Sequence, residues 1–447
     1  MKNIVKKYLL GLVTCVVVFS SCEKDINDIN ENNPNQFNDS DPILMLTGAQ
    51  LANVMLNEGD AARLSGIFSG HFTGVDRQYV SYNNYTVTSG DFDAAWANLY
   101  ANGIAQCRLI RAKAVESQNK ALEGVACITE ANLLLTASSL WGHIPNTQAC
   151  NPQIDKPDYD NMSDVYDYCI SLLDKAIPLV GSSSAYSAAY AGSFSWSDVA
   201  STIKARAHLH KGEYQKAIDA ATNGIAYGED LMANHSANVP GAWNLYYDFL
   251  DWNRAGYMSA DGSYLASLMD TTSGNPNYRG NAKTDESNRL PYYFTTDGYS
   301  ALDPNWIDGA FASNADFPIV SYVENELILS ESYWRTSDFT NALVHLNNAR
   351  KYNDSTYGGF DPYVQADFTD NNALLKEILV EKYVSLYGQI EAFTDVRRTN
   401  NLIGVKPNKG TKLPQRFLYP QSELNTNKAN VDKYYQSDVL ANLSLWP

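Results

Sequence analysis

The chain has 447 residues, of which 45% are hydrophobic, and a formal net charge of −17 at pH 7. It is therefore long enough to bury a large core. Its acidic balance, with no cluster of lysines and arginines, excludes nucleic acid as a partner.

The N-terminus begins with three lysines and an uncharged, mostly apolar run from Leu9 to Phe19, followed by Ser20, Ser21 and Cys22. This pattern describes a secretory signal, and the run is shorter than the roughly 20 apolar residues that a spanning helix needs. The residues before Cys22 resemble a bacterial lipobox. We therefore expect a signal peptide over residues 1–21 and a lipid on Cys22. The alternative is an ordinary secreted protein with a cysteine there by chance.

Residues 22–41 are rich in Asn, Asp and Glu and hold few apolar side chains. Such a segment buries too little surface to offset its ordering entropy, so we expect a flexible tether. Removal of residues 1–21 takes away three lysines and shifts the formal charge from −17 to −20. Beyond Cys22, the cysteines at 107, 127, 150 and 169 could form disulfides or stay free, and their spacings match no zinc motif.

Internal repeats are the main structural signal. The segment 205–225 predicts two helices joined at Gly212, with small residues where the helices cross and Tyr214 after the turn. This is a tetratricopeptide pattern, whose units must stack to bury their apolar faces.

Further copies are predicted downstream and upstream. In 330–349, Ser337, Phe339 and Ala342 take the places of Gly212, Tyr214 and Ala217. A more degenerate copy uses 131–141 and 165–178 as its two helices, and 92–115 is a candidate for another helix. The repeats therefore cover about 90–227 and 320–400.

An insert over about 228–318 separates these two groups of repeats. It holds 15 Phe, Trp and Tyr residues between Trp243 and Phe317, or 20% against 12% for the chain, mixed with turn-forming residues. This composition predicts loops, short helices and little strand. Loops on a rigid scaffold often carry binding function.

Three C-terminal segments, 322–334, 378–399 and 413–425, and the segment 140–145 resemble the SusD/RagB family of outer-membrane nutrient-binding lipoproteins. The resemblance implies a mainly α fold, with four tetratricopeptide-like pairs beside a loop-rich ligand-binding half. It also implies a SusC-type TonB-dependent transporter as partner, and a glycan or peptide as cargo. The domain would cover residues 42–447.

Arg397 and Arg398 fall in the second of these segments. They could form an anion site, but Asp395, Glu391 and Glu381 are close enough in sequence to pair with them. We therefore expect these residues to be structural.

Catalytic signatures are absent from the sequence. There is no His-Glu-x-x-His, Gly-x-Ser-x-Gly or P-loop motif, and 404–411 has P-loop residues in the wrong order. We expect no enzyme and no cofactor. Whether calcium binds, and the oligomeric state, are left open.

A sugar site needs aromatic rings that stack on C–H faces, together with hydrogen-bonding groups for hydroxyls. Two stretches offer this mixture. The candidate ligand contacts are Arg77, Tyr79, Tyr82 and Asn84 in the first stretch, and Trp243, Trp252, Tyr278, Tyr293 and Trp306 in the insert. Tyr79 and Trp252 are expected to be exposed stacking platforms, although each of these aromatics could instead fill a local core.

The sequence thus predicts a mainly α protein with tetratricopeptide-like repeats interrupted by a loop-rich aromatic insert. We expect a surface-exposed lipoprotein, held at the outer membrane by its lipid alone, that binds an oligosaccharide and passes it to a SusC-like transporter. The alternatives are a peptide binder of the same architecture and a repeat scaffold for protein partners. The identity of the glycan or peptide is open.

Overall fold

The computed structural model describes residues 40–238 and 241–441. The chain divides into a unit that ends at Leu44 and a second unit from Met45 onward, and the fold below is that of the second unit. The predicted signal peptide, Cys22 and nearly all of the tether lie outside the described residues. Among the residues described, no helix is long and apolar enough to cross a bilayer.

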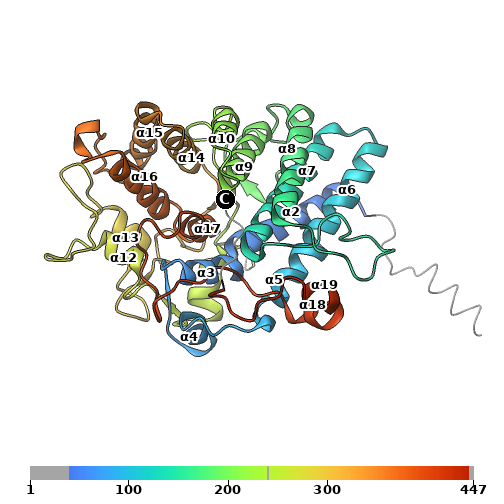
Figure 1. Cartoon of the computed structure of the whole chain (residues 1–447), viewed down its shortest axis with the longest axis horizontal. Helices are drawn as coiled ribbons and strands as arrows, with labels where there is room; N and C mark the ends of the chain where they lie inside the picture. Colours follow the sequence, from blue (N-terminus) through green and yellow to red (C-terminus); the bar gives the residue numbers. More distant parts are fainter. Residues whose placement is uncertain (1–39, 239–240, 442–447) are drawn as a thin grey trace, which may run out of the picture. The chain divides into compact units, whose positions relative to one another are not determined.

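Helices that pack in consecutive pairs form the scaffold of the second unit, as predicted, and most of them lie in the upper part of Figure 1. The pairs are α7 (Lys120–Trp141) with α8 (Met162–Val180), α9 (Trp196–His210) with α10 (Tyr214–Ala221), α14 (Tyr322–Arg335) with α15 (Phe339–Tyr357), and α16 (Asn371–Ser385) with α17 (Ile390–Arg398). α6 (Ala105–Glu116) packs against α7.

The turns within two of these pairs confirm the repeat alignment. Gly212 has φ +70° and Ser337 has φ +67°, so both aligned positions are left-handed. Ala342 is fully buried. A Cβ at Gly224 would lie 2.2 Å from Oδ1 of Asn325, so α10 ends in a contact that only glycine allows. The predicted small residues therefore mark real helix crossings.

The repeats are continuous in space although the insert separates them in sequence. α10 packs against α14, and the two helices share one apolar cluster. Its buried members are Ala205, Leu209, Ala217, Ile218, Ala220, Ala221, Ile328 and Leu329. The insert therefore leaves and re-enters the array at neighbouring helices.

The insert consists of short elements joined by loops, as predicted. They are β3 (Leu231–Ala233), α11 (Leu245–Tyr247), η3 (Asp248–Asn253), β4 (Met258–Ser259), α12 (Tyr264–Met269), α13 (Arg289–Tyr293), β5 (Phe294–Thr295), β6 (Asp303–Pro304) and β7 (Phe317–Val320). All strand pairs are antiparallel: β2 (Tyr190–Ala191) with β3, β3 with β7, β5 with β6, and β1 (Thr73–Gly74) with β4.

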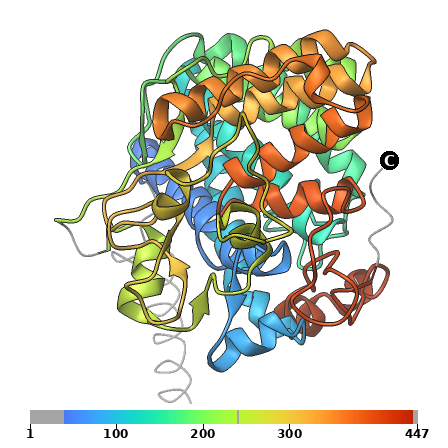
Figure 2. The same ribbon diagram turned by 90° about the vertical axis from the view of Figure 1, so that its left-hand side faces the viewer.

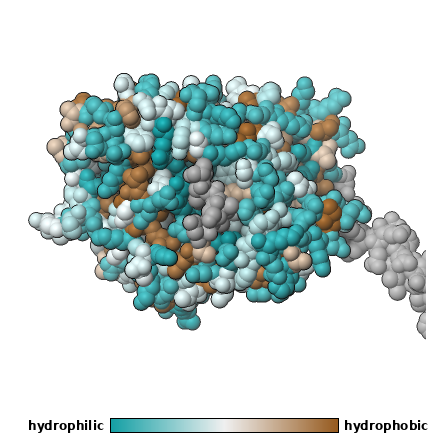
Figure 3. All heavy atoms as spheres, in the orientation of Figure 1, coloured by the Kyte–Doolittle hydropathy of each residue, from teal (hydrophilic) through white to brown (hydrophobic). Residues whose placement is uncertain are grey.

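Short elements from both ends of the chain lie below the repeat helices in Figures 1 and 2. These are α3 (Asp60–Phe68), α4 (Arg77–Asn83), η1 (Ser89–Phe92), α5 (Asp93–Ala97), η2 (Asn98–Ile104), α18 (Gln421–Thr426) and α19 (Lys428–Val431). The other helices are α2 (Pro42–Glu58) and η4 (Gln365–Asp367). Hydrophobic residues on the face shown in Figure 3 form small separate patches among hydrophilic ones.

Several charged residues of the C-terminal segments are buried in ion pairs. Arg398 bonds Asp395, as predicted, and also Glu331. Glu391 bonds instead to His210, whose Nε2 lies 2.7 Å from its Oε1, and Nζ of Lys382 lies 3.6 Å from the same oxygen. Arg397 donates to backbone carbonyl groups and to Thr394 rather than to these acids. These residues are structural, and the expected pairing is corrected for Glu391 and Arg397.

A second buried network joins the insert to the repeats. Glu381 lies 2.6 Å from Arg279, 3.2 Å from Arg289 and 3.6 Å from Arg350. Burial would raise the pKa of Glu381, but the three guanidinium groups hold that pKa well below its usual range. Because Arg279 and Arg289 belong to the insert, this network fixes the insert against α16. Glu381 therefore does not pair with Arg397 or Arg398.

The four cysteines within the described residues are free. Cys107, Cys127 and Cys169 are buried in helices, and Cys150 is exposed. The sequence left disulfides and free thiols open as alternatives, and the structure has free thiols.

Candidate functional site

A cavity of about 290 Å³ lies between α3, α4 and η3. This volume is at the lower end of the range for ligand pockets. The residues that line it are mainly aromatic and polar: Asp60, Arg63, Gln78, Tyr79, Tyr82, Asp91, Phe92, Asp248, Phe249, Asn253, Arg254 and Phe417, with Ala61, Leu64 and Ala95. The cavity thus unites the first candidate stretch with the insert.

Arg63 is a buried organiser of this cavity. Its Nη1 donates to the carbonyl of Leu245 at 3.2 Å, its Nε donates to the hydroxyl of Tyr79 at 3.3 Å, and its Nη2 bonds Asp60. The guanidinium carbon lies 4.4 Å from the ring centre of Phe249. Burial raises the pKa of Tyr79 to about 12, so its hydroxyl is neutral at pH 7. Arg63 therefore links α3, α4 and the start of η3.

Beside Tyr79, α4 presents a second tyrosine paired with a carboxylate. The hydroxyl of Tyr82 donates to Oδ1 of Asp91 at 2.9 Å, and the rings of Tyr79 and Tyr82 have centroids 5.0 Å apart. Oδ2 of Asp91 accepts from the backbone N–H and the hydroxyl of Thr88. Burial and then the charge of Asp91 raise the pKa of Tyr82, which keeps its hydroxyl protonated.

The third side of the cavity is η3, a single π-helical turn. Asn244 caps the helix that leads into it, since its Oδ1 accepts from the N–H groups of the next two tyrosines. Oδ2 of Asp248 accepts from Nδ2 of Asn253 at 2.6 Å, which matches the five-residue period of a π turn. The turn directs Asp248, Phe249 and Asn253 to the cavity. π turns are rare in proteins as a whole, but many of those that occur lie at functional sites.

Trp243, Tyr247 and Trp252 form an aromatic platform on the same segment. Trp252 is 69% exposed, and its ring centroid lies 5.5 Å from that of Trp243, which lies 5.5 Å from Tyr247. Trp252 directly precedes Asn253, so the platform adjoins the cavity wall. The platform offers the exposed indole of Trp252, whereas the cavity supplies hydrogen-bonding groups.

The structure brings together four of the nine predicted contact residues. Tyr79 and Tyr82 line the cavity, and Trp243 and Trp252 form most of the platform. The expectation that Tyr79 is an exposed platform is wrong. It is only 3% exposed, because Arg63 and Phe249 pack against it.

The other two predicted residues of the first stretch lie beside the cavity rather than on its lining. The side chain of Arg77 is 71% exposed, and its guanidinium carbon lies 5.9 Å from the ring centre of Tyr257. Asn84 is half-buried and caps α4 through its backbone N–H.

Three predicted residues of the insert lie away from the cavity lining. Tyr293 is buried and stacks on Tyr387 with centroids 4.4 Å apart, and Trp306 is buried under Tyr299 at 5.3 Å. Tyr278 is half-buried, and its hydroxyl accepts from a backbone N–H of the insert. These three contacts are packing contacts.

Sequence reasoning missed Arg63, Asp248, Phe249 and Asn253. Asp248 and Asn253 are polar residues five apart in the insert, but their approach across a π turn is visible only in the structure. Arg63 gave no signal either, because it lies in a helix far from the insert in sequence.

Two larger hollows lie elsewhere on the second unit. One of about 730 Å³ is lined by Arg108, Arg111 and Lys175, but these cations already pair with Glu130 and Glu123. Another, of about 490 Å³, is lined mainly by Trp96, Tyr100, prolines and alanines, with Asn151 and Glu423 as its few polar side chains. The hollow of about 730 Å³ has one aromatic residue in its lining, and that of about 490 Å³ has few polar side chains, whereas the first cavity combines several residues of both kinds.

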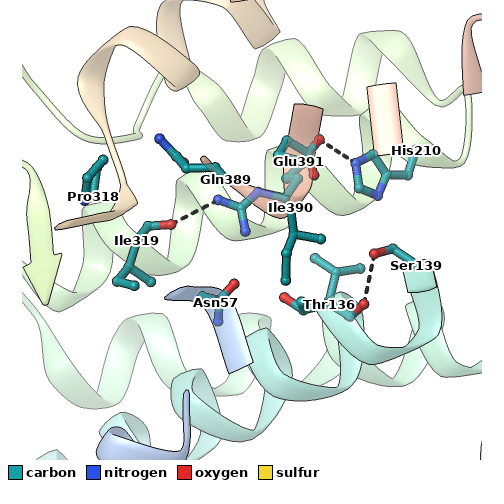
Figure 4. A pocket seen from close by; sticks show the side chains of 11 residues that line it. Asn57, Thr136, Ser139, His210, Pro318, Ile319, Gln389, Ile390 and Glu391 are labelled. Carbon is teal, nitrogen blue, oxygen red and sulfur yellow. Dashed lines mark hydrogen bonds and ion pairs between the residues drawn. The ribbon is translucent and has the colours of Figure 1, made fainter. Parts of the chain in front are cut away.

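A fourth cavity lies where α7, α9 and α17 meet (Figure 4). His210 bonds Glu391 at 2.7 Å, and on the same side of the cavity Ser139 donates to the carbonyl of Thr136. Its volume of about 20 Å³ fits a single water molecule, so it is not a site for a larger ligand. Within residues 40–238 and 241–441, no group of three or more His, Cys, Asp or Glu side chains could hold a metal ion.

Comparisons with known proteins match the whole folded region. The SusD-like family model, described as starch-binding and associating with the outer membrane, matches residues 34–420. A SusD-like protein from Bacteroides thetaiotaomicron is 17% identical, with a TM-score of 0.71 over 91% of this chain and 99% of its own. A chitin-binding SusD homologue from Flavobacterium johnsoniae is 14% identical, with a TM-score of 0.68 over 90% and 98%. At these identities the likeness establishes the fold. A sequence comparison with curated proteins gives no significant match.

Proposed function

This chain belongs to the SusD-like family, described as starch-binding and associating with the outer membrane, and from that premise we propose that it captures an oligosaccharide. It would do so at the cell surface and deliver the sugar to a SusC-like TonB-dependent transporter. The observation that carries the proposal is the cavity of about 290 Å³ beside the platform of Trp243, Tyr247 and Trp252.

The chemistry of the cavity supports a sugar ligand. Sugar hydroxyls need both donors and acceptors, which Gln78, Asn253, Arg254, Asp91 and Asp248 supply. Phe249 and Tyr82 add ring surface to the same cavity. An aromatic cavity with a few convergent polar groups is the usual form of a small-molecule site.

The platform supports a ligand longer than the cavity. Trp252 exposes 69% of its surface, although an indole is costly to leave in water. A sugar chain whose end fills the cavity would extend over Trp252 and cover that ring. The chitin-binding homologue from Flavobacterium johnsoniae agrees with a glycan, as does the starch-binding description of the family.

Binding without catalysis fits the state of the acidic side chains. Asp91 is engaged by Tyr82 and Thr88, and Asp248 is engaged by Asn253, so both carboxylates are held as hydrogen-bond acceptors. No histidine lines the cavity. We therefore infer a binding protein and not an enzyme.

The N-terminus supplies the proposed location. A lipid on Cys22 would anchor the protein, and residues 22–41 would give the folded domain reach above the outer membrane. Two or three acyl chains on one cysteine are enough for stable anchoring.

The test is calorimetric titration of the wild type against neutral oligosaccharides of starch and chitin type and against peptides. Trp252→Ala should weaken glycan binding about threefold to tenfold or more, because an aromatic contact is worth about 0.5–1.5 kcal/mol beyond buried area. The matched control is Tyr227→Ala, since Tyr227 is 53% exposed but lies on the repeat side. If only peptides bind, the proposal of a glycan ligand is refuted. If Trp252→Ala and Tyr227→Ala lose the same affinity for the glycan, the proposed location of the binding site is refuted.

A further inference from the structure

Acidic residues outnumber basic residues in the lining of the cavity. Asp60, Asp91 and Asp248 are acidic, whereas Arg63 and Arg254 are basic. Arg63 is buried and its charge is matched by Asp60, to which it bonds directly. Asp91 and Asp248 therefore face a ligand with only Arg254 to balance them.

The two carboxylates also keep acceptor sites free for a ligand. Each carboxylate has about four acceptor sites. Asp248 uses one for Asn253, and Asp91 uses three for Tyr82 and Thr88. Arg254 uses Nη1 for the carbonyl of Asn253 at 2.8 Å and keeps its other N–H donors, and Gln78 adds an amide. The cavity therefore offers both acceptors and donors, and its excess of negative charge decides which ligands it favours.

The surroundings add to this negative potential. Asp251 lies on η3 beside the platform, where its Oδ1 accepts from the hydroxyl of Tyr299 at 3.2 Å. The whole chain carries a formal charge of −17. Aromatic walls of low polarity strengthen the field of nearby carboxylates inside a cavity.

We propose that this cavity selects neutral and amino-substituted sugars and rejects uronate and sulfated sugars, with Asp248 as a specificity-determining residue. The inference rests on the proposed function and names its substrate class. Hydroxyl, amide and ammonium groups would donate to the free acceptor sites of Asp248. A carboxylate or sulfate on the ligand would meet like charges within the same cavity.

The test uses polymers that share one backbone and differ in charge. Affinity electrophoresis would compare neutral glycol chitin, cationic glycol chitosan and anionic carboxymethyl chitin, and the pair of soluble starch and carboxymethyl starch. We expect the affinity of the wild type for the anionic form of either polymer to be at least about tenfold lower than its affinity for the neutral form. High salt should reduce this difference in affinity.

The decisive variant is Asp248→Asn, which removes one charge but retains an oxygen that can accept from Asn253. It should narrow the preference for neutral over anionic polymer about threefold or more. Asp219→Asn, an exposed position on α10, changes the net charge equally and should leave the preference unchanged.

Two results would overturn the inference. Equal binding of neutral and anionic polymers by the wild type would refute charge selection and leave glycan capture standing, and an unaltered preference in Asp248→Asn would refute the role of Asp248. If no polymer of any charge binds, both this inference and the proposed function fail.

Discussion

Ala342→Trp is expected to destabilise the repeat array strongly. Ala342 lies in α15, has no exposed surface, and packs in a cluster with Val323 and Leu327 of α14. The hydroxyl of Ser330 donates to its carbonyl at 2.7 Å, so the two helices cannot separate without losing a buried hydrogen bond. An indole at this crossing forces the helices apart, at a cost of about 1–3 kcal/mol or more.

The assay is thermal unfolding followed by circular dichroism. For domains of about 150–250 residues 1 kcal/mol corresponds to about 2–4 °C, and the shift is smaller for a larger domain such as this one, so a drop of a few degrees is expected. The matched control is Val344→Trp, two residues further along the same helix, where the side chain is 47% exposed. Surface substitutions usually change stability by less than about 0.5 kcal/mol. Coincident melting curves for Ala342→Trp and the wild type would refute the repeat alignment.

Three further predictions concern the turn, a buried ion pair and the anchor. Ser337→Gly should raise the melting temperature, because a left-handed residue with a Cβ costs about 1–2 kcal/mol, and an unchanged or lower value would count against a strained turn. Burial lowers the pKa of His235, but its bond to Glu58 outweighs this and the net pKa lies above 6.5. The stabilisation that the charged His235 provides is therefore full below pH 6.5 and is lost as the pH rises through the folded pKa. His235→Gln should then lower the melting temperature more at pH 6 than at pH 8.5. A larger drop at pH 8.5 than at pH 6 would contradict this pairing. Cys22→Ala should abolish labelling by a palmitate analogue and release a folded protein from the membrane, whereas persistent labelling would refute lipidation at Cys22.

The repeat scaffold was predictable because its signals are local. Gly212 and Ser337 mark left-handed turns, and Ala217 and Ala342 mark crossings that admit no larger side chain. Each of these requirements involves a few neighbouring residues, so it leaves a pattern at fixed spacing.

The site was only partly predictable because its contacts join distant segments. Composition located the aromatic residues, and Trp252 is exposed as expected. Composition could not show that Tyr79 lies under Arg63 and Phe249, because those three residues come from α3, α4 and η3. Burial of an aromatic ring depends on such long-range packing, as it does for Tyr293.

The most direct test of the account is a crystal structure of the protein with a neutral oligosaccharide bound. We expect one sugar ring in the cavity between Tyr82 and Phe249, within hydrogen-bonding distance of Asp248, and the next sugar ring of the chain over Trp252. A sugar bound instead in the hollow lined by Trp96 and Tyr100, with the cavity beside η3 empty, would contradict it.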